Sequence, residues 1–171
     1  MNSEPSILFQ QTELGKSLGV RPIYATEGSS AFDLQAIGVA QKNGDTIINF
    51  DSDRYYVNIF PGDYVSFRTG LKIWLGSGGA DKHLVGLIFA RSGLGTKHGL
   101  VPRNCVGVID SDYQGEILVT LVNSGRDTQT VKFGDRIAQM LITEAIIPKF
   151  DLVDEWPETE RGSGGHGSTG K

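Results

Sequence analysis

Between residues 55 and 147 the sequence is a succession of short apolar runs separated by turn residues. The run Tyr55–Phe60 is aromatic and β-branched and stops at Pro61-Gly62-Asp63. Leu71–Leu75 alternates apolar and polar residues, as a half-buried strand does, and ends at Gly76. Further runs are Tyr64–Phe67, Leu84–Phe89, Glu116–Val122 and Ile137–Ile147. Strands at this spacing predict an all-β barrel or sandwich.

Helical signals are weak by comparison. No segment carries an i, i+3, i+4, i+7 apolar stripe over three turns, and Ser92–His98 is expected to form one short helical turn. The polar segment Gln41–Arg54 contains Asn43-Gly44 and indicates a hairpin or a surface insertion.

Length and charge narrow the class of protein. A chain of 171 residues with 39% apolar residues is expected to form one domain with its own core. The net charge of −4 argues against a broad nucleic-acid surface, but a local arginine cluster or a metal can still hold a small anion. The single Cys105, the lack of a signal peptide and the lack of a run of about 20 apolar residues predict a soluble, cytoplasmic protein without membrane contact.

The C-terminal end differs from the rest, so we expect a β domain over 1–153 and a connector with a mobile arm over 154–171. The arm begins with the acidic Asp154–Glu160 and ends in a stretch composed almost entirely of Gly and Ser. A disordered linker is the simplest interpretation. Gly165 to Lys171 matches part of a P-loop, but no strand leads in and the chain stops where the helix should begin. The Gly-rich backbone can nonetheless wrap phosphate oxygens.

Asp110-Ser111-Asp112-Tyr113-Gln114-Gly115 resembles the start of a calcium-binding loop. It does not complete a calcium loop, because Leu121 stands where that loop needs Glu. A plain β-turn is one interpretation. The other is catalytic, because Asp110 closes an apolar run and its carboxylate would stand at a strand end, where a general base could face a ligand.

Arg91-Ser92-Gly93 follows the run that begins at Leu84, and a strand-end Arg with Ser and Gly suits a phosphate. Ser92 lacks the Gly-x-Ser-x-Gly context of a serine nucleophile. The three histidines have no metal-ligand spacing, which argues against a structural zinc site.

Five segments, in this order, resemble the five motifs of the homotrimeric dUTPases. They are Ser30–Ala36, Ala90–Gly95, Asn104–Gly115, Gly134–Gln139 and Arg161–Gly170. The resemblance covers the chain from about Tyr24 onward. It implies a jelly-roll-like β fold, hydrolysis of dUTP to dUMP and pyrophosphate, Mg²⁺ held mainly by the triphosphate, and three active sites shared between subunits.

The resemblance also assigns roles to residues. Asp110 corresponds to the base that activates water, Tyr113 to the ring under the deoxyribose, and Asp33 to the carboxylate that touches the metal through water. Asn104, Gly107 and Ile109 correspond to the uracil-reading hairpin. Phosphate contacts are implied for Arg91, Ser92, Gly93 and Gln139, and tail contacts to the substrate for Arg161, His166, Gly167, Ser168 and Thr169.

Two positions depart from the pattern. Ala90 stands where the family usually has Pro, so we expect a less rigid loop. His166 stands where the tail usually has Phe. Since an imidazole offers less stacking area and changes charge between about pH 5 and 8, we expect weaker lid closure and pH-dependent activity.

Two other functions stay open at this point. A dCTP deaminase would share the fold, but the pair Asp110 and Tyr113 and the complete tail favour a dUTPase. A regulatory or protein-binding module of the same fold is the alternative from another class, with the segment around Asn43 as its expected partner site.

Overall fold

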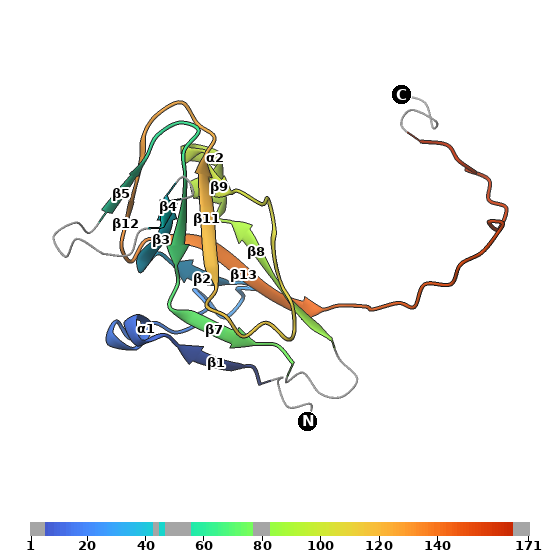
Figure 1. Ribbon diagram of the computed structural model, residues 1–171, viewed down its shortest axis with the longest axis horizontal. Coiled ribbons are helices and arrows are strands. Elements are labelled where there is room, and N and C mark those ends of the chain that lie inside the picture. Colours follow the sequence, from blue (N-terminus) through green and yellow to red (C-terminus); the bar gives the residue numbers. More distant parts are fainter. Residues whose placement is uncertain (1–5, 43–44, 47–55, 77–82, 166–171) are drawn as a thin grey trace.

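Two antiparallel sheets form the body of the molecule (Figure 1). The computed structural model describes residues 6–42, 45–46, 56–76 and 83–165. The larger sheet has the order β4-β3-β6-β11-β9, with β4 Asp45–Thr46, β3 Gly38–Lys42, β6 Tyr64–Arg68, β11 Leu118–Asn123 and β9 Leu100–Pro102. The second has the order β10-β8-β13-β2, with β10 Gly107–Ile109, β8 Leu84–Ala90, β13 Arg136–Glu144 and β2 Phe32–Gln35.

Two strand pairs and two short helices complete the described elements. β1 (Leu8–Gln11) pairs with β7 (Leu71–Trp74), and β12 (Gln129–Lys132) pairs with β5 (Tyr56–Ile59). The helices are α1 (Glu13–Ser17) and α2 (Ser92–His98). No helix among these residues is long and apolar enough to cross a membrane.

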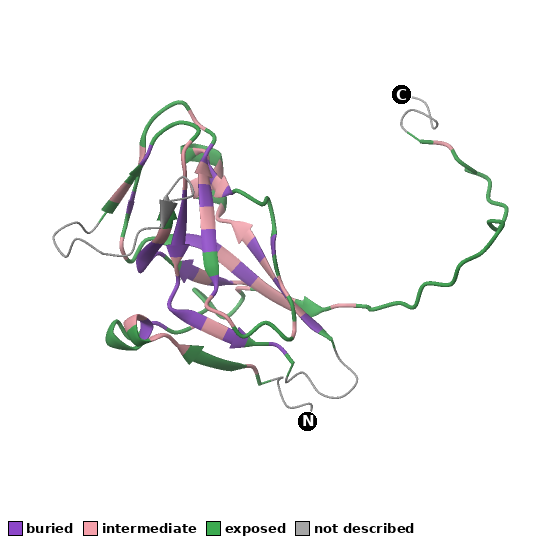
Figure 2. Cartoon of the chain, viewed as in Figure 1, coloured by how far each residue is buried: buried purple, intermediate pink, exposed green. Residues whose placement is uncertain are grey.

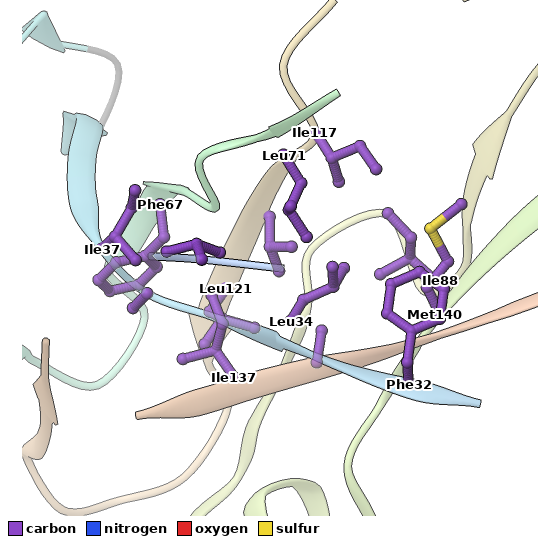
Figure 3. Packing of buried hydrophobic residues seen from close by; sticks show 14 of the residues in the cluster. Phe32, Leu34, Ile37, Phe67, Leu71, Ile88, Ile117, Leu121, Ile137 and Met140 are labelled. Atoms are coloured by element: carbon purple, nitrogen blue, oxygen red, sulfur yellow. The ribbon is translucent and has the colours of Figure 1, made fainter. Parts of the chain in front are cut away.

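The core lies between the two sheets and follows from strand alternation. Along β11 buried and more exposed residues alternate, so one face of the strand is apolar and turned inward (Figure 2). Facing side chains from both sheets meet there (Figure 3), among them Phe32, Leu34, Phe67, Leu121, Ile137 and Met140. This arrangement confirms the all-β prediction.

The predicted strands are observed with shifted ends, and some elements were missed. Ile137–Ile147 was expected as one strand, but β13 ends at Glu144 and Ile146 is 93% exposed. α2 has the bounds Ser92–His98 that the sequence predicted for a short helical turn, which confirms that prediction. α1 was not predicted, because five residues cannot carry an apolar stripe; Thr12 caps it by accepting the Gly15 N–H at 3.1 Å.

The segment Gln41–Arg54 contains a strand pair. Gln41 pairs with Thr46 across β3 and β4, which confirms the hairpin interpretation for these strands. Asn43, Gly44 and residues 47–54 lie outside the described part of the chain.

Candidate active site

An ion-pair cluster joins three elements at one edge of the four-stranded sheet. The Asp33 carboxylate on β2 receives Arg91 Nε at 2.8 Å on Oδ1 and Arg136 Nη1 at 3.1 Å on Oδ2. The Asp33 side chain is 17% exposed, whereas those of Arg91 and Arg136 are 31% and 51% exposed. The two guanidinium groups are therefore oriented by a shielded carboxylate and keep surface free for an anion.

A β-bulge decides that Arg136 joins this cluster. Gln139 lies opposite Asp33, and Ala138 lies opposite Leu34, but the next pair is Arg136 with Gln35. Ile137 is the extra residue, and both Ile137 and Ala138 are buried. Strict alternation would turn Arg136 inward, so the bulge is what brings it to the same face as Gln139.

Arg91 lies where β8 ends and α2 begins. It is the N-cap residue of α2 and makes no side-chain cap bond, which leaves its guanidinium for Asp33 and, at 3.3 Å, the Arg136 carbonyl. Ser92 and Gly93 form the first turn of α2, where backbone N–H groups have no partner inside a helix. A Cβ on Gly93 would meet no atom within 4 Å, so a ligand can approach this backbone closely. Gln139 donates from Nε2 to the Ala90 carbonyl at 3.1 Å.

Asn104 stands on a tight turn between β9 and β10. Cys105 has φ of 64°, its N–H donates to the Pro102 carbonyl at 3.0 Å, and the Val106 N–H donates to the Asn104 carbonyl at 2.7 Å. A Cβ on Gly107 would lie 3.1 Å from Ile88 Cβ and 3.6 Å from Asn104 Nδ2. The turn is therefore closely packed around the positions predicted to read uracil.

Two pockets are lined by predicted site residues. The larger, of about 430 Å³, is lined by Asn104 and Gly107 together with Ile88, Pro102, Val119 and Thr120. The smaller, of about 310 Å³, is lined by Arg91 and Arg136 together with Leu94, Gly134 and Asp135. Each predicted binding region thus has open space beside it.

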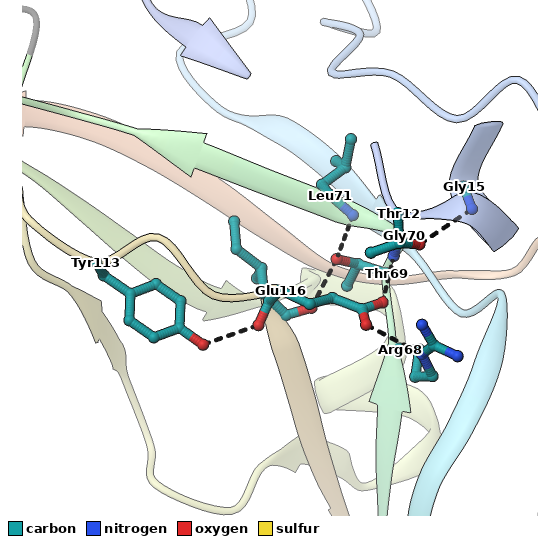
Figure 4. A network of polar contacts seen from close by, with 9 residues as sticks. Thr12, Gly15, Arg68, Thr69, Gly70, Leu71, Tyr113 and Glu116 are labelled. Atoms are coloured by element: carbon teal, nitrogen blue, oxygen red, sulfur yellow. Dashed lines mark hydrogen bonds and ion pairs between the residues drawn. The ribbon is translucent and has the colours of Figure 1, made fainter. Parts of the chain in front are cut away.

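Asp110 and Tyr113 share one turn after β10. The Tyr113 N–H donates to the Asp110 carbonyl at 3.2 Å, and the Asp110 side chain is exposed. The Tyr113 hydroxyl donates to the Glu116 carbonyl at 2.9 Å (Figure 4). The candidate base and the candidate sugar platform are therefore neighbours on a turn that is held at both ends.

The Asp33–Arg91–Arg136 cluster and the turn of Asp110 and Tyr113 are the two groups of candidate site residues, and they lie far apart within one chain. β10 and β2 are the outer strands of the four-stranded sheet, three strand spacings apart, which is about 14 Å. Asp33 lies level with Phe89 on β8, while Asp110 follows Ile109, which pairs with Gly86. This offset adds about 13 Å along the strands. A single copy therefore does not bring the Asp110 carboxylate to the Asp33–Arg91–Arg136 cluster.

The C-terminal segment 145–165 runs away from the body without helix or strand (Figure 1). Arg161 donates from Nε to the Gly164 carbonyl at 3.0 Å and approaches neither group. His166, Gly167, Ser168 and Thr169 lie outside the described residues.

Sequence reasoning overlooked Arg136 and Glu116. Arg136 lies within Gly134–Gln139, one of the five segments that resemble dUTPase motifs, and a cation three residues before Gln139 was the available signal. Only the bulge explains why the Arg136 side chain turns toward Asp33. Glu116 was assigned to a strand, whereas β11 begins at Leu118 and the Glu116 carboxylate binds Arg68 and Gly70.

The described residues do not form a metal site by themselves. Within the described ranges no three His, Cys, Asp or Glu side chains are grouped to hold an ion. Asp33 offers both oxygens to arginine, yet a carboxylate oxygen has a second lone pair that can accept from a metal-bound water. This donor set fits an ion that arrives with a polyphosphate and touches the protein through water.

Comparison with known proteins agrees with the motifs. The dUTPase family model matches residues 40–170. The chain is 42% identical over 149 residues to the deoxyuridine 5'-triphosphate nucleotidohydrolase of Pseudomonas syringae pv. tomato, covering 87% of this chain and 86% of that protein.

Solved structures show the same fold. A Staphylococcus bacteriophage 80alpha dUTPase mutant with dUpNHpp superposes with a TM-score of 0.74 at 18% identity, over 98% of this chain and 100% of that one. A mutant dUTPase from phage phi11 of S. aureus, described with a structural Mg(II) ion, gives 0.66 at 17% identity over 88% and 98%. The predicted jelly-roll-like dUTPase fold is thereby confirmed. With five ordered motifs, a family model over most of its length and relatives of matching size, this chain belongs to the dUTPase family.

Proposed function

We propose that this chain hydrolyses dUTP to dUMP and pyrophosphate. The observation that carries the proposal is the turn shared by Asp110 and Tyr113, which the short strand β10 joins to the packed turn of Asn104, in a chain of the dUTPase family. In this proposal one continuous segment supplies the base, the ring for the sugar and the groups that read the pyrimidine.

In the proposed reaction Asp110 accepts a proton from a water molecule, and the water oxygen attacks the α-phosphorus. The bond between the α-phosphorus and the oxygen that bridges to the β-phosphorus breaks, and pyrophosphate leaves with that oxygen. A positioned base of this kind contributes about 10²–10⁴-fold. Bound to the triphosphate, and through water to Asp33, Mg²⁺ would supply positive charge as the pyrophosphate leaves.

The arginine cluster would bind the phosphates of the substrate, and the turn of Asn104 would bind its base. Arg91, Ser92, Gly93 and Gln139 would hold phosphate oxygens through a guanidinium, helix N–H groups and an amide, and Arg136 would add a second guanidinium. Asn104 and the backbone at Gly107 and Ile109 would read uracil, and a close fit around the bound ring would exclude the methyl of thymine.

The proposed active enzyme is a homotrimer with shared sites. The separation of Asp110 from the Asp33 cluster supports this, because the two groups can act on one triphosphate only if they come from different copies. The exposed apolar side chains of the segment 145–165 support it as well, since they require a covering surface. The exposed fractions are 93% for Ile146, 93% for Phe150, 99% for Leu152 and 87% for Trp156.

Residues 154–171 are proposed to form a mobile arm that closes over a site built by other copies, with residues 1–153 as the β domain. Arg161, Gly167, Ser168 and Thr169 would contact phosphates, and His166 would stack on the base. A His166→Phe variant tests the arm: we expect a lower KM and a flatter activity profile between about pH 5 and 8. An unchanged KM and pH profile would remove the role of His166.

The activity test is pyrophosphate release from dUTP with Mg²⁺, run beside dTTP, dCTP and UTP. Release from dUTP is expected in the wild type and lost in Asp110→Asn. Asp112→Asn is the matched control, because Asp112 is exposed on the same turn. Ammonia release from dCTP would indicate the deaminase instead. Binding of dUTP without release would favour a regulatory, protein-binding role.

A further inference from the structure

We propose that Glu116 is a positioning residue that fixes the Tyr113 ring and thereby sets the preference for a 2'-deoxy sugar over a ribose. The inference rests on the proposed function, in which Tyr113 lies under the sugar. Glu116 does not touch the substrate in this proposal; it acts through the Tyr113 ring.

The Tyr113 ring folds back over its own turn. Its hydroxyl donates to the Glu116 carbonyl at 2.9 Å, three residues along the chain. A Cβ on Gly115 would lie 2.3 Å from the Tyr113 hydroxyl oxygen and 2.5 Å from Cζ, so the ring rests directly on the Gly115 backbone. The orientation of the ring is therefore set by the position of residues 115 and 116.

The Glu116 side chain fixes that position from the other side (Figure 4). Its Oε1 accepts the Gly70 N–H at 2.9 Å, and its Oε2 receives Arg68 Nε at 3.0 Å. The Glu116 side chain is 14% exposed and that of Arg68 is 35% exposed. A carboxylate this shielded is held by its two charge-assisted partners, because water is largely excluded from it.

The next residue continues the attachment. The Ile117 N–H donates to the Leu71 carbonyl at 2.8 Å, and the Ile117 carbonyl accepts the Thr69 hydroxyl at 2.6 Å. The Glu116 side chain and the Ile117 backbone thus each make two hydrogen bonds to residues 68–71. Because Tyr113 is bonded to Glu116, the ring is tied through this attachment to the body of the sheet.

A fixed ring has a specific consequence for the sugar. If the Tyr113 ring cannot move away from the sugar, the 2'-hydroxyl of a ribose contacts the face of the ring and is buried without a hydrogen-bond partner. If the attachment loosens, the ring can tilt away and the ribose is accepted more easily. Loss of the Glu116 charge should therefore change the ratio of kcat/KM for dUTP to kcat/KM for UTP. A general loss of stability should leave that ratio unchanged.

The experiment compares kcat/KM for dUTP and UTP in the wild type, Glu116→Gln and Gly115→Ala. Glu116→Gln removes the ion pair with Arg68 but keeps an acceptor for Gly70. Gly115→Ala pushes the ring directly and leaves the carboxylate in place; it does not depend on a positive φ, because that of Gly115 is not positive. We expect the dUTP-to-UTP ratio to fall on the order of tenfold in both.

Ser66→Ala is the control for stability alone. It removes a contact between β6 and β11, the 3.1 Å bond donated by the Thr120 hydroxyl to Ser66, without reaching Tyr113. We expect a lower Tm and an unchanged substrate ratio. In a Tyr113→Phe background, Glu116→Gln should cause no further fall in the ratio, because the bond that links the two residues is already absent.

A Glu116→Gln protein with reduced Tm and an unchanged dUTP-to-UTP ratio would overturn the proposal and leave Glu116 with a structural role only. The same ratio is measured independently of turnover as the affinity for dUpNHpp against its ribose counterpart. If the wild type released no pyrophosphate from dUTP, the proposed function would fail, while this affinity ratio would still support or reject the role of Glu116.

Discussion

The two halves of the candidate site are built in different ways. The turn region, from Asn104 to Glu116, is continuous in sequence; hydrogen bonds within its turns shape it, and Glu116 anchors its end to Arg68 and Gly70. The arginine cluster of Asp33, Arg91 and Arg136 is assembled from β2, the end of β8 and the start of β13, up to 103 residues apart in sequence. The first half depends on turn chemistry, and the second depends on strand register.

This difference teaches where each half is vulnerable. A glycine substitution in the turn region changes a close packing contact: the missing Cβ of Gly115 leaves space for the Tyr113 ring, and that of Gly107 leaves space for Ile88 on β8. A substitution in the cluster leaves a charge without its partner. Since an unpaired shielded charge costs more than a lost neutral contact, substitutions in the cluster are expected to give larger effects than those at the two glycines.

The largest expected effect separates the halves by complementation. Arg91→Ala and Asp110→Asn should each lower kcat/KM by about 10²-fold or more. Co-assembled from equal amounts of the two variants, about a quarter of the sites should contain both intact residues if the halves come from different copies. Pyrophosphate release from dUTP measures the recovery.

A mixture as inactive as its two components would show that both halves come from one chain, provided that light scattering shows mixed oligomers. As a control, Asp110→Asn protein taken alone through the same co-assembly procedure should recover no activity.

Asp33→Asn should produce the next largest effect. The two arginines lose the carboxylate that orients them, so kcat/KM for dUTP should fall about tenfold and the Mg²⁺ concentration for half-maximal activity should rise. A titration of activity against Mg²⁺ checks this. Asp127→Asn is the control, because Asp127 is exposed and lines neither of the two pockets. An unaltered Mg²⁺ dependence would contradict the assigned contact.

Gly107→Ala tests the turn region with a smaller change. Its Cβ would meet Ile88 at 3.1 Å, so the turn must shift by a few tenths of an ångström and the slot beside Asn104 should widen or tilt. We expect KM for dUTP to rise several-fold with about 1 kcal/mol lost from the free energy of unfolding. Steady-state kinetics and urea denaturation measure the two quantities. Equal KM values for the variant and the wild type would count against a tight uracil slot.

Arg103→Ala should give the smallest effect of the four. The Arg103 guanidinium lies 4.1 Å from the centre of the Tyr64 ring, and its backbone N–H donates to the Thr120 carbonyl at 2.8 Å. Loss of the ring contact should cost about 0.5–1 kcal/mol and raise KM for dUTP only slightly. Arg103→Lys should recover part of the stability, as measured by Tm. A strong fall in kcat would instead indicate a direct role at the substrate.

The strands show which elements could be predicted from the sequence and which could not. Alternation in Leu71–Leu75 and the apolar run from Leu84 located β7 and β8 within a residue or two. α1 was missed because its five residues are stabilised by the Thr12 cap and by the close approach of Gly15 to Gly70, which is a tertiary contact. The end of β13 was misplaced, since Ile146 and Ile147 are apolar yet exposed in the single chain.

The sequence by itself determined an all-β chain with Asp110 and Tyr113 on one turn, because these features depend on residues close together along the chain. It also determined, through ordered motifs, the family. Only the tertiary structure decided that Arg136 turns toward Asp33, that Asp110 lies far from both, and that Glu116 ties Tyr113 to Arg68. Those relations depend on strand order, register and one bulge, and pairing between distant strands leaves no periodic trace in the residues that it brings together.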